Sequence, residues 1–165
     1  MMNMDMKLVP VSAKNEAVYH RLLQCYEAEF SRLTKKFPDE NGIFPLDTEL
    51  GDSVFALLLF WKEKPVGFAA IEIKGEKSYE GKEYYVIPVC RREGLGSQFA
   101  RQIFAQYPGN WEIKQIQGAT DAKNFWQRTL TLKGPKILDL QEDLFQDPYW
   151  GPVTRQKFVS SSDGI

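Results

Sequence analysis

The chain has 165 residues, 43% of them hydrophobic and 13% aromatic, and its formal net charge is −1 at pH 7. This length suits a single domain over residues 1–165 with a sizeable core. The balanced charge excludes the basic field typical of nucleic-acid-binding and membrane-surface proteins, so neither kind of partner is expected.

The chain has too few cysteines and histidines for a zinc cluster or a disulfide framework, and its apolar runs are too short for a membrane helix. Two cysteines and one histidine exclude a cysteine–histidine zinc cluster and disfavour a disulfide framework, so we expect no metal. No signal-peptide pattern opens the chain, and its longest apolar run, Val54 to Trp61, is far shorter than the ~20 residues of a membrane helix. These features predict a soluble, cytoplasmic protein.

The first half of the chain predicts a strand, a helix, a loop and a hairpin. Residues 6–12 form a candidate strand, and Asn15 is expected to cap a helix because apolar residues then repeat at helical spacing. Residues 35–52 are polar and interrupted by proline and glycine, which predicts a long loop. Two apolar runs, residues 53–61 and 66–74, flank a short turn and predict an antiparallel hairpin.

The second half predicts a further strand, two helices separated by a strand, and two closing strands. Thr120 or Asp121 is expected to cap the second of these helices, and residues 160–165 are expected to form a frayed tail. The elements are expected, in chain order, at residues 81–89, 95–107, 110–116, 120–130, 136–141 and 155–160.

The order of these elements predicts an α/β fold of the α+β kind. Antiparallel strands come first and a single β-α-β crossover comes late, which favours a mixed, mostly antiparallel sheet over a doubly wound parallel one. The strands that hold residues 84–88 and 111–116 should be parallel neighbours. The crossover helix should begin at the pair Gly94 and Gly96.

The segment VIPVCRREGLGS, residues 86–97, places two cations and two glycines at the start of that helix. A helix N-terminus carries about half a positive charge and leaves its first N–H groups without partners. Gly94 and Gly96 would let a phosphate approach the main chain, and Arg91 and Arg92 would add charge-assisted hydrogen bonds. Taken singly, paired arginines are typical of a solvated surface and glycines of a tight turn. The residues alone leave both alternatives open.

Two well-known phosphate-binding patterns do not fit this segment. A P-loop requires a lysine directly after its second conserved glycine, and none follows Gly96. A dinucleotide fingerprint, G-x-G-x-x-G, requires a third glycine at the position where this chain has Phe99.

The segment does resemble the pyrophosphate loop of the GNAT superfamily of acetyl-CoA-dependent N-acetyltransferases. The likeness lies in the pattern Val86-x-Pro88-x-x-Arg91-Arg92-x-Gly94-x-Gly96. In addition, PVGFAAIEI resembles the family's third strand, and WEIKQI with ATDAKNFWQ resembles its fifth strand and the following helix. DENGIF and YWGPVTRQKFV resemble an uncharacterised bacterial branch. The resemblance implies a GNAT-like acyl-CoA N-acyltransferase fold with acetyl-CoA as co-substrate.

In that family the loop N–H groups bind the CoA pyrophosphate, and the end of the preceding strand pairs with the pantetheine. An N–H directed at the thioester carbonyl would stabilise the oxyanion that develops there. Asn124 is included as a substitute for a family asparagine whose place Ala119 takes. The resemblance thus implies the cofactor-binding residues Tyr84, Tyr85, Val86, Arg91, Arg92, Glu93, Gly94, Leu95, Gly96, Ser97 and Asn124.

Direct acetyl transfer needs a neutral amine, and deprotonating a lysine-like amine at pH 7 costs about 4.6 kcal/mol. A base is therefore useful. Many family members carry a glutamate on the fifth strand, where this chain has Lys114. Glu112 lies two residues earlier on the same strand face and is the candidate catalytic base, with Glu72 on the third strand as the alternative.

The general acid of the family is also replaced, because Trp126 takes the place of a tyrosine. An indole N–H can donate a hydrogen bond but does not titrate in the useful range. The CoA thiolate would then leave unaided, take a proton from water, or take one from Tyr107 or Tyr149.

These features predict an N-acetyltransferase that moves an acetyl group to a primary amine by direct attack in a ternary complex. The acceptor would be a small-molecule or peptidyl amine. Acidic residues of the 35–52 segment would favour a cationic one: Asp39, Glu40, Asp47, Glu49 and Asp52. The alternatives are a CoA-binding sensor or interaction domain without catalysis, and an enzyme for another phosphate cofactor. Exposed strand edges commonly pair, so a homodimer is also considered.

Overall fold

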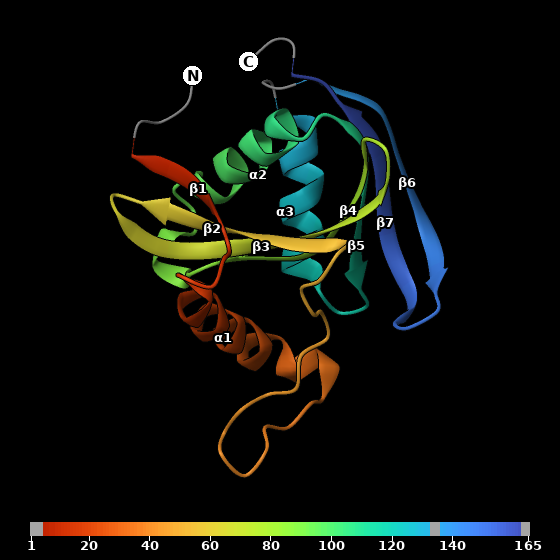
Figure 1. The fold of residues 1–165 in the computed structure, drawn as a ribbon. Helices are drawn as coiled ribbons and strands as arrows, with labels where there is room; N and C mark the ends of the chain where they lie inside the picture. The colour runs from red at the N-terminus through yellow and green to blue at the C-terminus, as the bar shows by residue number, and fades with distance from the viewer. Residues whose placement is uncertain (1–4, 133–135, 163–165) are drawn as a thin grey trace.

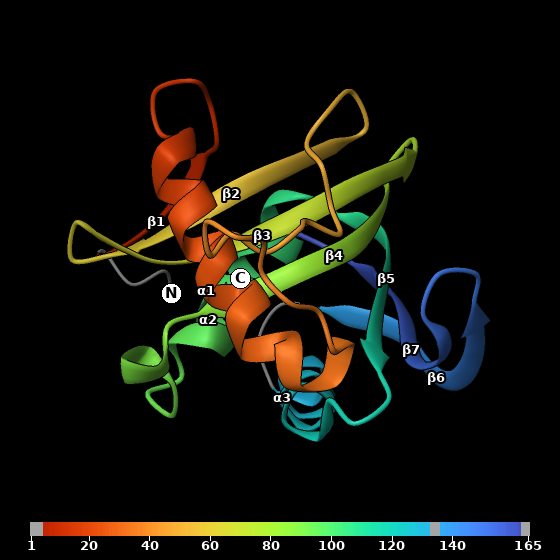
Figure 2. The ribbon, with the colours of Figure 1, turned by 90° about the horizontal axis from the view of Figure 1, so that it is seen from below.

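A computed structural model of the chain describes residues 5–132 and 136–162. Within these ranges it forms a seven-stranded sheet in the order β1-β2-β3-β4-β5-β7-β6. One helix, α1, crosses one face of this sheet, and α2 and α3 cover the other face (Figures 1 and 2). The mixed, mostly antiparallel α/β fold predicted from the sequence is confirmed.

The order of strands and helices also agrees with the prediction. The first half contains β1 (Met6–Pro10), α1 (Glu16–Thr34), β2 (Val54–Trp61), β3 (Lys64–Gly75) and β4 (Ser78–Val86). The second half contains a short 3₁₀ turn (Pro88–Cys90), α2 (Leu95–Gln106), β5 (Gly109–Ile116), α3 (Thr120–Thr131), β6 (Ile137–Asp147) and β7 (Gly151–Ser160).

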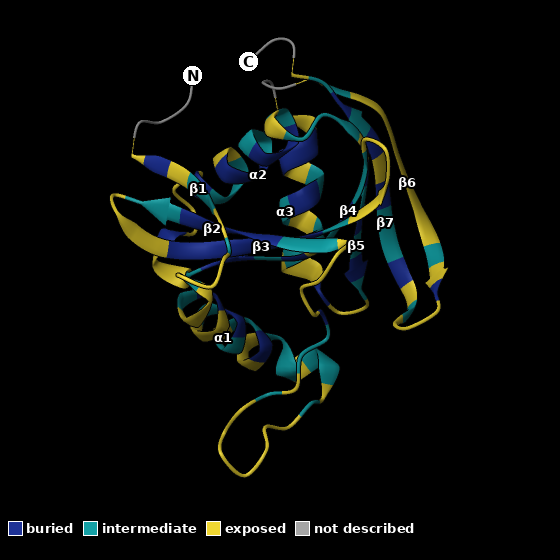
Figure 3. Ribbon diagram, viewed as in Figure 1, coloured by how far each residue is buried: buried dark blue, intermediate teal, exposed yellow. Residues whose placement is uncertain are grey.

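Two hydrophobic layers hold the helices onto the sheet. Tyr19 and Leu23 of α1 pack on Phe68 of β3, which gives the layer on the α1 face. On the other face, α2 contributes Phe99 and Ile103 to a larger cluster that also includes residues of α3. Figure 3 shows that the buried residues follow these contacts, whereas β6 at the sheet edge is exposed along most of its length.

The sheet opens between β4 and β5, its one parallel pair among the described strands. Pairing joins residues 78–81 of β4 to residues 110–113 of β5 and ends there. Just beyond this point Lys82 forms a bulge in β4, because Ala70 opposes Glu83 while Ile71 opposes Gly81. A bulge bends a strand, and Figure 2 shows β4 and β5 diverging.

The two strands are parallel neighbours, as the sequence predicts. Their pairing lies at the start of β4, away from residues 84–86 at its other end. The crossover is present, yet the last residues of β4 face a gap instead of a neighbouring strand.

The predicted helix caps are partly corrected. Asn15 occupies the predicted cap position of α1, but its side chain accepts from the Ser12 N–H and donates to the Pro10 carbonyl and makes no capping bond to the helix. Ala119, and neither Thr120 nor Asp121, occupies the cap position of α3. At the C-terminus Ser160 ends β7, and residues 163–165 of the expected frayed tail lie outside the described residues.

Candidate active site

Two cavities meet at the gap between β4 and β5. The larger, about 820 Å³, lies beside the start of α2, and we call it the α2 groove. The smaller, about 370 Å³, lies toward α1 and the turn between β6 and β7, and we call it the acid cavity. Both are lined by Tyr84, Ala119 and Ala122. A ligand in the groove and one in the cavity would therefore meet at the end of β4.

The start of α2 presents main-chain N–H groups to the α2 groove. In the described part of the chain, the first amide at this helix end with a hydrogen bond is that of Gln98, which donates to the Gly94 carbonyl. The N–H groups of residues 92–97 have no acceptor among the described residues. Gly94 adopts a left-handed conformation with φ of 79°, which glycine tolerates best. Unpartnered amides at a helix N-terminus are suited to hold an anion.

Tyr84 of β4 holds the first turn of α2 through a hydrogen bond to its main chain. Its hydroxyl donates to the Gly96 carbonyl at 2.5 Å, and its ring stacks on Phe125. That carbonyl belongs to the peptide group whose N–H is the free amide of Ser97. A Cβ at Gly96 would lie 3.1 Å from the Phe125 ring, so any larger residue there would have to displace this ring slightly.

The two arginines of the loop have different surroundings. Arg91 donates to both Glu29 carboxylate oxygens at 2.9 Å, and its Nε donates to the Val86 carbonyl at 2.8 Å. Its guanidinium thus joins the end of β4 to α1, and it does not face the groove as an unpaired cation. Arg92 is exposed, lines the groove and has no ion-pair partner among the described residues.

The free edge of β4 supplies main-chain groups at the gap. Ile87 donates its N–H to the Val66 carbonyl on the β3 side. Since alternate residues of a strand direct their main chains to opposite edges, those of Tyr84 and Val86 face the gap. The Tyr85 side chain packs in the layer on the α1 side of the sheet and also lines the α2 groove.

Glu83, which the sequence analysis did not select, lines the acid cavity. It is 6% exposed, and its Oε1 has no hydrogen-bond partner among the described atoms. Burial, together with the negative charge of Glu27, raises the pKa of Glu83 to about 8. A single glutamate within KEYYVIPV, next to a lysine, looks like a solvent-facing residue, and no local signal marks it as buried.

The predicted bases lie outside the cavity. Glu112 accepts from Arg155 at 3.3 Å and does not line either cavity. Glu72 lies 3.5 Å from the ammonium of Lys82. Lys114 does line the acid cavity and donates to Asp147 at 2.9 Å. Burial lowers the pKa of Lys114, but this bond and the nearby carboxylates outweigh it and raise the pKa overall.

The remaining predicted residues divide into two groups. Trp126 is buried and lines the acid cavity. Tyr149 is exposed but also lines this cavity, and its hydroxyl donates to Asp47 at 2.9 Å. Asn124 is exposed and does not line the groove, and Tyr107 packs on Phe55 and Tyr79 away from the cavities. The side chains of Glu93, which is exposed, and Leu95, which is buried, do not line the α2 groove, so only their main-chain N–H groups could contact a ligand there.

The mixed sheet with its late β-α-β crossover is the fold of GNAT acyl-CoA N-acyltransferases. A family model described as the acetyltransferase (GNAT) family matches residues 15–130, and the chain belongs to this family. It is thereby an acetyltransferase, and the predicted resemblance is confirmed. A comparison with curated proteins finds no match.

Solved structures agree on the fold. An acetyltransferase from Thermus thermophilus is 17% identical with a TM-score of 0.65, covering 96% of this chain and 99% of that one. A GNAT acetyltransferase from Elizabethkingia anophelis with acetyl-CoA bound is 16% identical with a TM-score of 0.54, covering 96% and 99%. Spermidine N-acetyltransferase from Vibrio cholerae, in complex with CoA and spermine, is 8% identical with a TM-score of 0.59, covering 95% and 96%.

Proposed function

We propose that the protein transfers an acetyl group from acetyl-CoA to a primary amine by direct attack in a ternary complex. The observation that carries this proposal is the row of unoccupied amides at the start of α2, beside an open groove. Bound there, acetyl-CoA would supply the thioester. The pyrophosphate would accept from these amides, and Arg92 would add a positive charge.

Main-chain groups of β4 would hold and polarise the thioester at the gap. The N–H of Val86 or Tyr84 can donate to the carbonyl oxygen, on which negative charge develops as the amine attacks. The Arg91 guanidinium donates to the Val86 carbonyl, which lies in the peptide group directly after the Val86 N–H, so it holds this end of β4 in place before any ligand enters. Arg91 is thus proposed as a positioning residue.

Glu83 replaces Glu112 as the proposed proton acceptor. It lines the cavity that reaches the gap, and it directly precedes Tyr84 in β4. Its carboxylate would take the proton of the amine, directly or through one water, as the nitrogen attacks. The thiolate would leave unaided or take a proton from water. Of the two phenols considered, Tyr149 is at the cavity, where its hydroxyl is engaged by Asp47.

The proposal is tested by measuring CoA thiol release from acetyl-CoA with a panel of primary amines. Amine-dependent release, with the acetylated amine identified by mass spectrometry, supports it. Tight binding of acetyl-CoA with only background hydrolysis across the panel would favour the alternative of a CoA-binding sensor or interaction domain without catalysis.

We expect Tyr84→Phe to weaken CoA binding about three- to tenfold, on the order of 1 kcal/mol. The change removes the hydrogen bond to the Gly96 carbonyl and so loosens the peptide group that carries the Ser97 amide. Isothermal titration measures the effect, and Tyr79→Phe is the matched control because that tyrosine of β4 lines neither cavity. Equal affinities for the two variants would show that this hydroxyl does not support the anion site.

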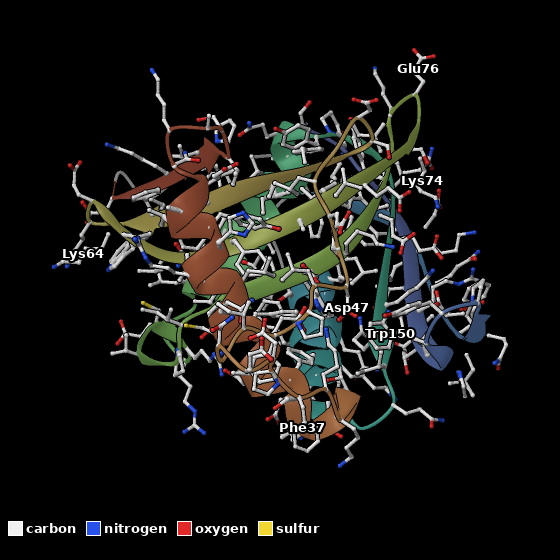
Figure 4. All side chains as sticks on the ribbon, turned by 60° about the horizontal axis from the view of Figure 1, so that its bottom comes forward. Phe37, Asp47, Lys64, Lys74, Glu76 and Trp150 are labelled. Carbon is white, nitrogen blue, oxygen red and sulfur yellow. The ribbon has the colours of Figure 1, made fainter. Side chains whose placement is uncertain are left out.

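We expect Arg92→Gln to weaken CoA binding several-fold at low ionic strength and to reduce the salt dependence of the dissociation constant. The reason is that an unpaired, exposed cation attracts a phosphate mainly through a screened Coulomb interaction. Lys64→Gln, at the distant start of β3 (Figure 4), removes the same charge elsewhere and should leave both quantities unchanged. A salt dependence identical in Arg92→Gln and wild type would remove Arg92 from the anion site.

The cellular setting belongs to the same proposal. No helix in the described ranges is long and apolar enough to cross a membrane. We propose a bacterial, cytoplasmic enzyme of one domain, and we retain the homodimer as a prediction for size-exclusion chromatography with light scattering.

A further inference from the structure

The acid cavity has an excess of negative charge. Asp47, from the loop after α1, and Trp150, from the β6–β7 turn, lie close together in Figure 4 and both line it. Its described lining includes two lysines, Lys82 and Lys114. Against them stand the carboxyl groups of Glu27, Asp47, Glu80, Glu83 and Asp147. Glu83 is mainly protonated at pH 7, because its pKa is about 8, and the Lys36 ammonium lies against Glu27 and Asp47, which leaves four carboxylates against three ammonium groups. An amine that enters this cavity meets a net negative field.

One side of the cavity already binds an alkylammonium group. The ammonium of Lys36 lies 2.8 Å from Glu27 and 2.9 Å from Asp47, and it donates to the Pro45 carbonyl at 2.8 Å. Glu27 is fully buried, and carboxylate oxygens of Glu27, Asp47 and Glu83 lie within 4.8 Å of one another. The lysine side chain shows that this cluster accommodates an ammonium on an unbranched stem.

A place for a second hydrogen-bond donor remains beside it. Glu83 is 6% exposed, and its Oε1 is unpartnered among the described atoms. A divalent metal fits this place poorly, because calcium requires six to eight oxygen ligands and Lys36 already occupies two of the three carboxylates. A protonated amine, with three N–H donors, satisfies the vacant oxygen directly.

Aromatic side chains line the acid cavity together with Glu83. Tyr26 and Phe30 of α1 line the cavity on one side, and Tyr149 and Trp150 line it on the other. Aromatic faces accept both an alkyl stem and a cationic head. An acceptor that carries a carboxylate next to its amine would instead place that charge among the cavity's own carboxylates.

We infer that the acceptor is an alkylammonium compound with no carboxylate close to the reacting nitrogen, such as a side-chain-type amine or a polyamine, and that free α-amino acids are excluded. This inference rests on the proposed function. It names the substrate class through the charge of the acid cavity, whereas the proposed function requires a primary amine of any kind.

The test compares two acceptors that differ by one group. Pentylamine and norleucine have the same carbon chain, except that norleucine carries a carboxylate beside the amine. Norleucine amide controls for bulk at that carbon without the charge. With wild-type enzyme and saturating acetyl-CoA, we expect kcat/KM for pentylamine to exceed that for norleucine at least a hundredfold, with the amide between them.

Charge variants keep the inference falsifiable. Glu80 and Glu72 both form ion pairs with Lys82. Glu80 lines the acid cavity, whereas Glu72 does not. We expect Glu80→Gln to reduce the pentylamine-to-norleucine ratio about five- to tenfold and Glu72→Gln to leave the ratio unchanged. Equal or better turnover of norleucine by wild type would overturn the inference and leave the proposed function standing. Absence of turnover with every amine would overturn both.

Discussion

Replacing Glu83 by glutamine is expected to lower kcat for amine acetylation about a hundredfold or more. A positioned general base contributes roughly 10²–10⁴ to a rate, and glutamine keeps the shape of the side chain without accepting the proton. Glu112→Gln is the matched control, since that carboxylate is held by Arg155 outside both cavities. Initial rates of thiol release measure the effect, and the dissociation constant for CoA should stay the same in both variants.

The pH dependence separates the base from a merely structural carboxylate. Glu83 faces Tyr19, Tyr26 and Glu27 of α1 and Lys36, Asp47 and Thr48 of the following loop. Because its pKa is about 8, the reactive carboxylate is the minor form at pH 7. The ratio of wild-type to Glu83→Gln activity should therefore rise with pH and level off above about pH 8. This ratio cancels the titration of the amine itself. A ratio that does not vary with pH contradicts the role.

The contribution of Glu83 to folding stability should decrease as the pH rises, whereas the activity ratio increases. The pKa of Glu83 rises from 4.5 in the unfolded chain to about 8 in the folded one, so the folded state keeps a proton that the unfolded state releases. Stability from this group is therefore lost as the pH increases through that window. We expect Glu83→Gln to raise the melting temperature at pH 8–9 and to change it little at pH 5. Thermal unfolding at the two pH values checks the sign.

Replacing Gly94 by valine is expected to raise the dissociation constant for acetyl-CoA at least tenfold, about 1.4 kcal/mol. Gly94 has a φ of 79°, and a β-branched residue is a strained outlier in that conformation. The strain is relieved by moving the first turn of α2, which displaces the amides of Leu95, Gly96 and Ser97. Isothermal titration measures the loss.

Gly42 provides a control with the same backbone conformation. Its φ is 78°, and an added Cβ would meet nothing within 4 Å. Gly42→Val therefore costs similar strain in the loop after α1 without touching the α2 groove. If both variants bind acetyl-CoA as the wild type does, the amides of α2 do not hold the cofactor. If both lose affinity alike, the effect comes from general destabilisation.

The sequence predicted the fold well because its signals are local. The apolar spacing of α1 and of α2 and the hairpin pattern of β2 and β3 each extend over a few neighbouring residues. The start of α2 was predicted for the same reason, since Gly94 and Gly96 directly precede and begin the helix.

The parts that the sequence did not predict depend on distant residues. Arg91 was expected to face the anion, but its partner Glu29 is 62 residues away and takes its guanidinium instead. Glu83 was not selected, because its burial depends on α1 and on the loop that holds Asp47. Glu112 was chosen by its distance from Lys114 along β5, and the pairing of β5 with β7 gives it Arg155 as partner.

The most direct test of the account is a ¹H–¹⁵N NMR titration of the labelled protein with CoA. We predict that the amide resonances of Leu95, Gly96 and Ser97 shift strongly downfield, as expected when an N–H donates to a phosphate oxygen, while that of Gly42 stays in place. Inorganic pyrophosphate should shift the same three signals at higher concentration. Saturable CoA binding that perturbs other residues and leaves these three unchanged would contradict the central claim.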